Sequence, residues 1–355
     1  MSRARCIKGI ALYTITIYID ILSDTTSDYL QPPRTMPNVL VLGGSGYLGL
    51  ALSKSLVASG NYTVWGSARS PEKAKLLAQN EITPVESDVT NLETLSTIII
   101  ENNINVVVDT TSAYEQAAQI LQGVTDAAKS RRDALAKENV IGPKLGFVYC
   151  SGMWIHGSPS ARVSDLSPVG TTISKGKSAT ATAWRPAHEQ AILAARDVLD
   201  VAILRPATIY GRGSWVWSTW WEPVLKAKQN GNNSHAIQIP ADDKARSPTI
   251  HVDDVASGFH AAIDRIDGQL GAWPVFNLIT ETIGVQEITE AVKGALGVRA
   301  PVEYTGTHAN VFLEALSLVS KTEAARARTV LGWKPRRTEF LLNIPVYLRA
   351  WEAAQ

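Results

Sequence analysis

The sequence has almost no cysteine, since Cys6 and Cys150 are the only two among its 355 residues. This excludes a disulfide-stapled scaffold and a cysteine-rich metal centre, so we expect no metal site and a reducing, cytoplasmic compartment. The chain also lacks an excess of charge, because 34 Lys and Arg stand against 33 Asp and Glu. No whole-chain field is available to attract nucleic acid or an anionic membrane, and we expect neither as a partner.

Long hydrophobic runs are missing as well. The strongest candidate, residues 10–19, follows three basic residues in the manner of a signal sequence. It is short for a membrane span, Asp20 interrupts it, and no small-residue cleavage site follows, so we expect no stable membrane insertion. Met36 directly precedes the first strong strand pattern. Residues 1–35 are therefore interpreted as an extension outside the fold, with a membrane anchor as the less favoured alternative.

What the chain does contain is a globular composition, with 45% hydrophobic and 19% charged residues. From residue 38 onward, short apolar runs alternate with helical periodicity. This alternation predicts the α/β class, as a Rossmann-type, doubly wound parallel sheet with a smaller C-terminal substrate-binding lobe. The predicted strands are 39–42, 62–66, 83–86, 106–109, 146–150 and 201–204.

The composition of the chain changes after Tyr210, first to a Trp-rich stretch and then to a polar loop. We therefore expect an NAD(P)-binding Rossmann domain over residues 36–210 and a mainly substrate-binding lobe over 211–355. Within that lobe, two segments are expected to return to the Rossmann part, namely 249–260 and 274–279. Helices are predicted at 285–296 and 339–352.

A glycine-rich turn follows the first predicted strand. Gly43, Gly46 and Gly49 are spaced G-x-x-G-x-x-G between an apolar strand and a predicted helix. In such a turn the glycines allow a tight bend, a close approach of the backbone to a pyrophosphate, and packing of helix on strand, while the helix N-terminus attracts the anion. This context predicts a dinucleotide site, which also includes the intervening residues Ser45, Tyr47 and Leu48.

The end of the second strand indicates which dinucleotide is bound. An acidic residue there would accept the ribose hydroxyls of NAD(H), but none is present. Arg69 stands there instead, with Ser67 and Ser70 as further donors, and a guanidinium matches a 2′-phosphate well. NADP(H) is therefore favoured over NAD(H), with an ordinary solvated arginine as the alternative.

Asp88 and Val89 follow the third predicted strand. They are expected to contact the adenine ring, the carboxylate at its amino group and the next backbone amide at the ring itself. Alternatively, Asp88 caps the helix that begins near Leu92.

Further segments carry a resemblance to a known family; they are residues 147–157, 204–211, 251–256, 276–278 and 331–335. With the glycine turn and Asp88, they make residues 37–355 similar to an extended, atypical short-chain dehydrogenase/reductase of the NAD-dependent epimerase/dehydratase type. The resemblance implies a nicotinamide cofactor in contact with Pro206, a small-molecule substrate and an oxidoreductase activity. It also suggests a homodimer.

The catalytic positions depart from that family. Its members use a Tyr whose pKa is lowered by a Lys four residues later, with a Ser or Thr that binds the reacting oxygen. Trp184 and His188 stand at the Tyr and Lys positions here, and Gly152 replaces the hydroxyl residue, with Ser151 beside it. Indole cannot exchange a proton, whereas imidazole can, so His188 is expected to act as acid or base, or only to bind the cofactor ribose. Ser151 is the candidate oxygen-binding residue.

Two tyrosines remain as replacement phenols, Tyr210 and Tyr114, although tyrosines at such positions more often pack or contact cofactor. His251 is expected to line the substrate cleft at a junction between strand and helix, where one of the two following aspartates, 253 or 254, caps the helix. Arg246 lies near the place where nucleotide-sugar enzymes use an arginine for phosphate, but one position out of step.

Aromatic residues are the expected substrate contacts, because indoles combine a broad apolar surface with a donor at its edge. The alternative is a role in the core or in a dimer contact. The tryptophans in question are Trp154, Trp184, Trp215 and Trp217.

Two functions fit these patterns. The first is an NADP(H)-dependent carbonyl reductase, or an epimerase/dehydratase-like enzyme, acting on a small molecule of an aromatic or natural-product type through a rebuilt active site that lacks Tyr-x-x-x-Lys. The second is a non-redox NADP(H)-binding regulator or scaffold, or a redox-neutral isomerase that reuses the pocket. The loss of the Tyr, Lys and Ser positions together motivates the second, because fold alone does not fix function.

Overall fold

The computed structural model describes residues 36–355 except 232–233. Residues 37–355 form one compact unit, and the predictions for residues 1–35 lie outside the described residues. Among the described helices, none combines the length and apolarity that crossing a bilayer requires.

The centre of this unit is a seven-stranded sheet in which every neighbouring pair is parallel. Its order is β10-β6-β5-β4-β1-β2-β3, so the order reverses between β4 and β1 and the predicted Rossmann-type fold is confirmed. The strands are β1 (Asn38–Leu42), β2 (Thr63–Ser67), β3 (Thr83–Val85), β4 (Val106–Asp109), β5 (Leu145–Cys150), β6 (Leu199–Pro206) and β10 (Val275–Leu278). Each of the six predicted strands is present, with ends displaced by two residues at most.

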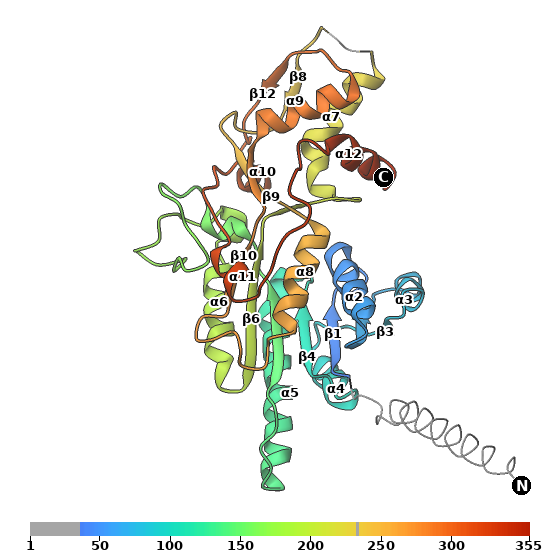
Figure 1. Cartoon of the computed structure of the whole chain (residues 1–355), viewed down its shortest axis with the longest axis vertical. Coiled ribbons are helices and arrows are strands. Elements are labelled where there is room, and N and C mark those ends of the chain that lie inside the picture. The colour runs from blue at the N-terminus through green and yellow to red at the C-terminus, as the bar shows by residue number, and fades with distance from the viewer. Residues whose placement is uncertain (1–35, 232–233) are drawn as a thin grey trace, which may run out of the picture. The chain divides into compact units, whose positions relative to one another are not determined.

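Helices cover both faces of the sheet, and two apolar clusters result (Figure 1). On one face lie α2 (Tyr47–Ser59), α3 (Pro71–Ala78), α8 (Val252–Ile263) and α11 (Ala325–Thr329). On the other lie α4 (Leu92–Glu101), α5 (Ala117–Lys137) and α6 (Arg185–Ala194). The strands between them are buried on both sides, which is why they are almost uniformly apolar.

A third apolar cluster fills the C-terminal lobe. Its strands are β7 (Thr208–Tyr210), β9 (Arg246–His251) and β11 (Glu281–Gly284) in one small sheet, and β8 (Ile237–Ile239) with β12 (Val302–Tyr304) in another. Its helices are α7 (Ser218–Gln229), α9 (Val285–Leu296), α10 (Val311–Leu316) and α12 (Ile344–Glu352). The helix predicted at 285–296 is α9, whereas the one predicted at 339–352 begins only at Ile344, because Pro345 lacks a backbone N–H and is suited to the first turn of a helix.

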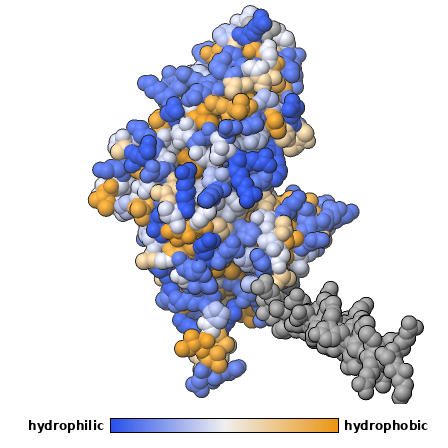
Figure 2. Space-filling model, in the orientation of Figure 1, coloured by the Kyte–Doolittle hydropathy of each residue, from blue (hydrophilic) through white to orange (hydrophobic). Residues whose placement is uncertain are grey.

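Short 3-10 helices connect several of these elements: η2 (Tyr114–Gln116), η3 (Met153–His156), η4 (Thr180–Thr182), η5 (Ala195–Asp197) and η6 (Trp215–Trp217). On the face drawn in Figure 2, hydrophobic residues form small separate groups among hydrophilic ones. This face therefore offers no broad apolar surface for a partner, and the homodimer stays a prediction.

Candidate functional site

The glycine turn joins β1 directly to α2. Gly43 has a φ of +76°, which only glycine adopts readily, and a Cβ on Gly49 would lie 2.1 Å from the Gly43 carbonyl oxygen. A Cβ on Gly46 would lie 3.0 Å from the same oxygen. The glycines are therefore what allows the first turn of α2 to start against the end of the strand.

The N-terminus of α2 is open to an anion. Gly46 is its N-cap and supplies no side-chain acceptor, and the first turn contains no acidic residue. The first backbone N–H groups of a helix have no intrahelical partner and carry partial positive charge, so this end fits a pyrophosphate. The Tyr47 hydroxyl donates to the Gly211 carbonyl oxygen at 2.6 Å and ties the turn to the segment after β7. Leu48 points into the core.

Arg69 follows β2 at the same edge of the sheet. Its side chain is exposed and makes no hydrogen bond or ion pair with any residue in the described ranges. The two serines beside it have other partners, because Ser67 Oγ accepts from Gly43 N at 2.8 Å and Ser70 Oγ accepts from Lys73 N at 3.4 Å as the cap of α3. Of these three predicted donors, Arg69 is the one left unengaged.

Asp88 does not cap α4, since Asn91 holds that position with its side chain on Thr94 N. The Asp88 carboxylate instead accepts from the backbone and the hydroxyl of Thr90, and these bonds lower its pKa. The capping alternative is therefore wrong. Val89 is buried in the cluster beneath.

Three buried polar atoms without partners lie where β5 ends and α6 begins. They are the hydroxyl oxygen of Ser151, Nε2 of His188 and Nε of Arg185. Each of these residues is tied to the last residues of β5. Ser151 follows the strand, the His188 ring packs edge-on against Tyr149 with centroids 4.9 Å apart, and Arg185 Nη1 donates to the Cys150 carbonyl oxygen at 3.3 Å. Buried polar groups normally have partners, so this cluster indicates a place for a ligand.

His188 is held neutral at pH 7. Burial lowers its pKa, and the positive charge of Arg185 lowers it further, while Glu189 acts in the opposite direction. A neutral imidazole with a free nitrogen can accept a proton or a hydrogen bond. His188 therefore has the chemistry that an acid/base role requires, and that role stays a prediction.

Arg185 is the site residue that sequence reasoning missed. Its side chain is 7% exposed and its guanidinium lies over the rings of Tyr114, at 5.1 Å, and Trp184, at 5.3 Å. Each such contact is worth about 0.5–2 kcal/mol, against several kcal/mol for taking a charge out of water. Gly152 does not explain the position of this group, because a Cβ there would lie in ordinary van der Waals contact with Nη1, at 3.7 Å. No local sequence signal marked Arg185, since one of the two rings against its guanidinium comes from Tyr114, far away in the sequence.

A second buried arginine fixes α6 to the sheet. Arg205 of β6 pairs with Glu189 through two nitrogens, Nε to Oε1 at 2.9 Å and Nη2 to Oε2, with both side chains 1% exposed. Beside it, burial and the Arg205 charge lower the pKa of His156 to about 3, and its Nε2 lies 3.2 Å from Asn277 Oδ1. Pro206, the next residue, ends β6 next to Gly152.

The expectation for Tyr210 and Trp217 is not met, because both side chains belong to the core of the C-terminal lobe. Trp217 is 1% exposed and donates through Nε1 to the Ile209 carbonyl oxygen at 2.8 Å, so it is not available to substrate. Tyr210 is fully buried and donates to the Arg337 carbonyl oxygen at 2.7 Å, and burial raises its pKa. Neither residue reaches the unpartnered cluster.

Trp154 and Trp215 lie nearer the surface. Trp215 is 64% exposed, and its ring stacks on that of Phe312. The Trp154 ring packs edge-on against the same Phe312 ring, with the centroids 5.8 Å apart. Trp184 differs, since its ring lies 5.7 Å from that of His188. Of the four tryptophans, only Trp184 is thus in contact with the cluster.

His251 has a structural role, and its place in a substrate cleft stays a prediction. It is the N-cap of α8, with Nδ1 accepting from Asp253 N at 3.1 Å, so the prediction that an aspartate caps this helix is wrong. The reason is that β9 continues to His251 and leaves both aspartates inside the helix. Burial lowers the pKa of His251 to about 4, and its ring packs against Tyr210. Asp254 accepts from two backbone amides, those of residues 336 and 337.

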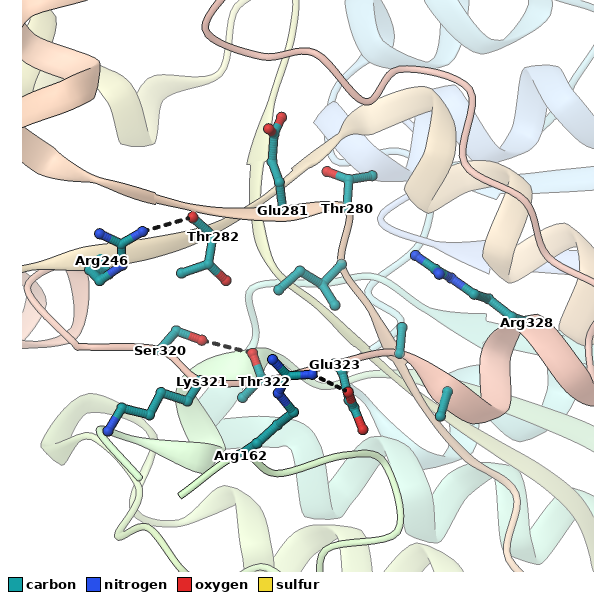
Figure 3. A pocket seen from close by; sticks show the side chains of 13 residues that line it. Arg162, Arg246, Thr280, Glu281, Thr282, Ser320, Lys321, Thr322, Glu323 and Arg328 are labelled. Atoms are coloured by element: carbon teal, nitrogen blue, oxygen red, sulfur yellow. Dashed lines mark hydrogen bonds and ion pairs between the residues drawn. The ribbon is translucent and has the colours of Figure 1, made fainter. Parts of the chain in front are cut away.

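The shift of Arg246 by one position turns it outward, because successive residues of a strand face opposite sides. Ser247 is buried and donates to Thr208 Oγ1 at 3.1 Å, while Arg246 reaches the Thr282 carbonyl oxygen and Glu287. Arg246 thereby lines a separate pocket of about 620 Å³ (Figure 3). This pocket shares no residue with the cluster at α6, and its cations are Arg162, Arg246, Lys321 and Arg328.

The geometry defines a class of protein before any comparison. A parallel sheet whose order reverses between β4 and β1, followed there by a glycine turn and an open helix N-terminus, is a Rossmann-type dinucleotide-binding fold. The model of the NAD dependent epimerase/dehydratase family matches residues 39–277. The chain belongs to this family, and its relatives of this type are oxidoreductase-type enzymes.

Solved structures agree on the fold. A dTDP-glucose 4,6-dehydratase from Bacillus anthracis, in complex with NAD, is 17% identical with a TM-score of 0.66, over 90% of this chain and 97% of that one. A UDP-glucose 4-epimerase from Bifidobacterium longum, in complex with NAD+ and UDP, is 20% identical with a TM-score of 0.59, over 89% and 98%. The curated proteins contain no match to this chain. At these identities the likeness shows the fold alone.

Proposed function

We propose that this protein is an NADP(H)-dependent oxidoreductase that interconverts a carbonyl group and an alcohol on a small molecule. The observation that carries the proposal is the pair of buried, unpartnered polar atoms on Ser151 and His188 at the carboxyl end of β5. Ligands of open α/β sheets bind outside this edge of the sheet. Atoms that can bind and protonate an oxygen therefore lie where a substrate is expected.

The cofactor site is supported by the fit of the residues present. The glycine turn and the N-terminus of α2 would hold the pyrophosphate, and Arg69 would pair with a 2′-phosphate. Asp88 would lie at the adenine end. When bound, the nicotinamide supplies hydride transfer to or from carbon.

The chain's own residues then manage the oxygen. The Ser151 hydroxyl donates to the reacting oxygen and stabilises negative charge that develops on it. His188 exchanges the proton: its neutral form takes it from an alcohol, and its protonated form returns it when a carbonyl is reduced. Because its pKa is lowered, His188 is better suited at pH 7 to accept a proton than to donate one.

The test uses the full chain with NADPH, NADH and a panel of aldehydes, ketones and alcohols. His188→Ala should lower kcat by roughly 10²–10⁴-fold with little change in NADP+ affinity. Arg69→Ala should weaken NADPH binding but leave NADH binding as it was. Tight NADPH binding with no turnover of any carbonyl or alcohol would instead support the regulator or scaffold. The cytoplasmic location, inferred from the scarcity of cysteine, and the homodimer, implied by the family resemblance alone, are further predictions.

A further inference from the structure

Arg185 is a buried cation without a direct ion-pair partner among the described residues. It forms no ion pair there, and its only hydrogen bond runs from Nη1 to the Cys150 carbonyl oxygen. Two carboxylates lie nearby but have other partners. Asp109 accepts from the backbone and hydroxyl of Thr111, and Glu189 is held by Arg205.

The free part of the guanidinium is one complete edge. Nε and Nη2 lie side by side on a planar group and together match the two oxygens of a carboxylate. Arg205 uses this same edge to hold Glu189. In Arg185 the edge has no partner, and its Nε is buried.

The edge is also held in position. The rings of Tyr114 and Trp184 both lie against the guanidinium, and Nη1 is fixed on the end of β5. Tyr114 belongs to η2 and is 53% exposed, and Trp184 is partly exposed, so solvent reaches the enclosure at these two rings. A fixed, desolvated cation with a free edge is an arrangement that favours an anion over a neutral group.

Arg185 and His188 are three residues apart on α6 and therefore neighbours on one face of the helix. Both contact the last residues of β5, as does Ser151. A molecule held by the Arg185 edge would have its neighbouring carbon and oxygen atoms within the same small region.

We infer that Arg185 binds a carboxylate of the substrate, and that the substrates are oxo acids and the hydroxy acids that correspond to them. This rests on the proposed function, because it names the substrate class of the same site. Arg185 is then the residue that determines specificity, whereas Ser151 and His188 act on the reacting oxygen. The pocket of Figure 3 is not needed for this recognition.

Binding to the full chain tests the inference without turnover. Phenylpyruvate, pyruvate and their methyl esters are titrated calorimetrically in the presence of saturating NADP+, which cannot reduce them. For the wild type we expect each acid to bind at least 10-fold more tightly than its ester. Arg185→Gln should reduce that preference to less than about twofold, and Arg185→Lys, which keeps the charge but not the planar edge, should retain only part of it.

The matched control is Arg328→Gln, which removes an exposed cation from the pocket of Figure 3. It should leave the preference for the acids intact. Equal binding of acid and ester to the wild type overturns the inference with no variant needed. A preference that survives Arg185→Gln, or moves with Arg328→Gln, overturns it too, as does a loss of NADP+ affinity in Arg185→Gln, which would make the cofactor the anion.

The two proposals fail in different ways. Tight binding of the acids without any turnover contradicts the proposed oxidoreductase but upholds the carboxylate site. Turnover of neutral carbonyl compounds, without a preference for acids, upholds the oxidoreductase and contradicts the carboxylate site.

Discussion

Two buried arginines lie next to helix α6, and they differ in what faces the guanidinium. Arg205 is fully buried and presents its Nε and Nη2 edge to Glu189 on the helix. Arg185 is almost as deeply buried, but the same edge has no hydrogen-bond partner in the described part of the chain. Each arginine also lowers the pKa of a neighbouring histidine, Arg205 that of His156 and Arg185 that of His188.

The difference separates a structural pair from a site. A charge that is paired within the chain holds elements together, here α6 and β6. A charge that is enclosed but unpaired lowers stability unless something outside the chain binds it. The comparison therefore predicts a large loss of stability when Arg205 is replaced and little change when Arg185 is replaced.

The largest effect is expected for Arg205→Met, which leaves Glu189 as an unpaired charge in the core. The free energy of unfolding should fall by roughly 3–5 kcal/mol, as measured by urea denaturation at pH 7. The double variant Arg205→Met with Glu189→Leu removes both charges and should recover most of that loss. If the double variant is as unstable as the single one, packing and not charge explains the effect.

The next effect concerns acid stability. His156 has a pKa of about 3 in the folded protein and about 6.5 when unfolded, so only the unfolded state takes up a proton between these values. Its contribution to stability is complete above pH 6.5 and is lost as the pH falls, at about 1.4 kcal/mol per pH unit. In His156→Gln this part of the slope should vanish in urea denaturation between pH 7 and 4.5. Replacing the exposed His308 in the same way should leave the slope unchanged.

Local patterns explain which parts of the candidate site could be predicted from the sequence. The glycine turn was predictable because strand, glycines and helix follow one another directly. His188 and Ser151 were proposed because a family resemblance indicated two positions to inspect, and their catalytic roles stay predictions. Arg185 was missed, since its burial depends on Tyr114, which lies some seventy residues earlier and comes from a different element.

The aromatic residues show the same limit. A Trp-rich segment predicts a large apolar surface but not which way that surface faces. Trp217 faces inward because Phe340 packs against it, and this partner is more than one hundred residues away in sequence. The N-cap of α8 was wrongly predicted for a related reason. Pairing of β9 with β7 extends β9 to His251, so that the helix starts at the next residue and His251 becomes its cap.

A smaller effect is expected for Arg185→Met, and its size tests the comparison directly. The variant loses one hydrogen bond and two ring contacts but also removes a buried, unpaired charge. These effects should nearly cancel, so the free energy of unfolding should change by less than about 1 kcal/mol. A loss as large as that of Arg205→Met would show that Arg185 has a partner within the chain and serves the fold.

The smallest effect is on the titration of the two histidines. In Arg185→Gln, the positive charge that disfavours protonation of His188 is gone, so the pKa of His188 should rise toward its ordinary value. The pKa of His156 should not change, because burial and Arg205 determine it. Histidine NMR signals followed between pH 4 and 8 measure the pKa of His188. For His156 they show only that its pKa stays below the lower end of this pH range. A His188 signal that titrates identically in both proteins would mean that the ring does not face the guanidinium, and the acid/base role and the carboxylate site would then belong to different places on α6.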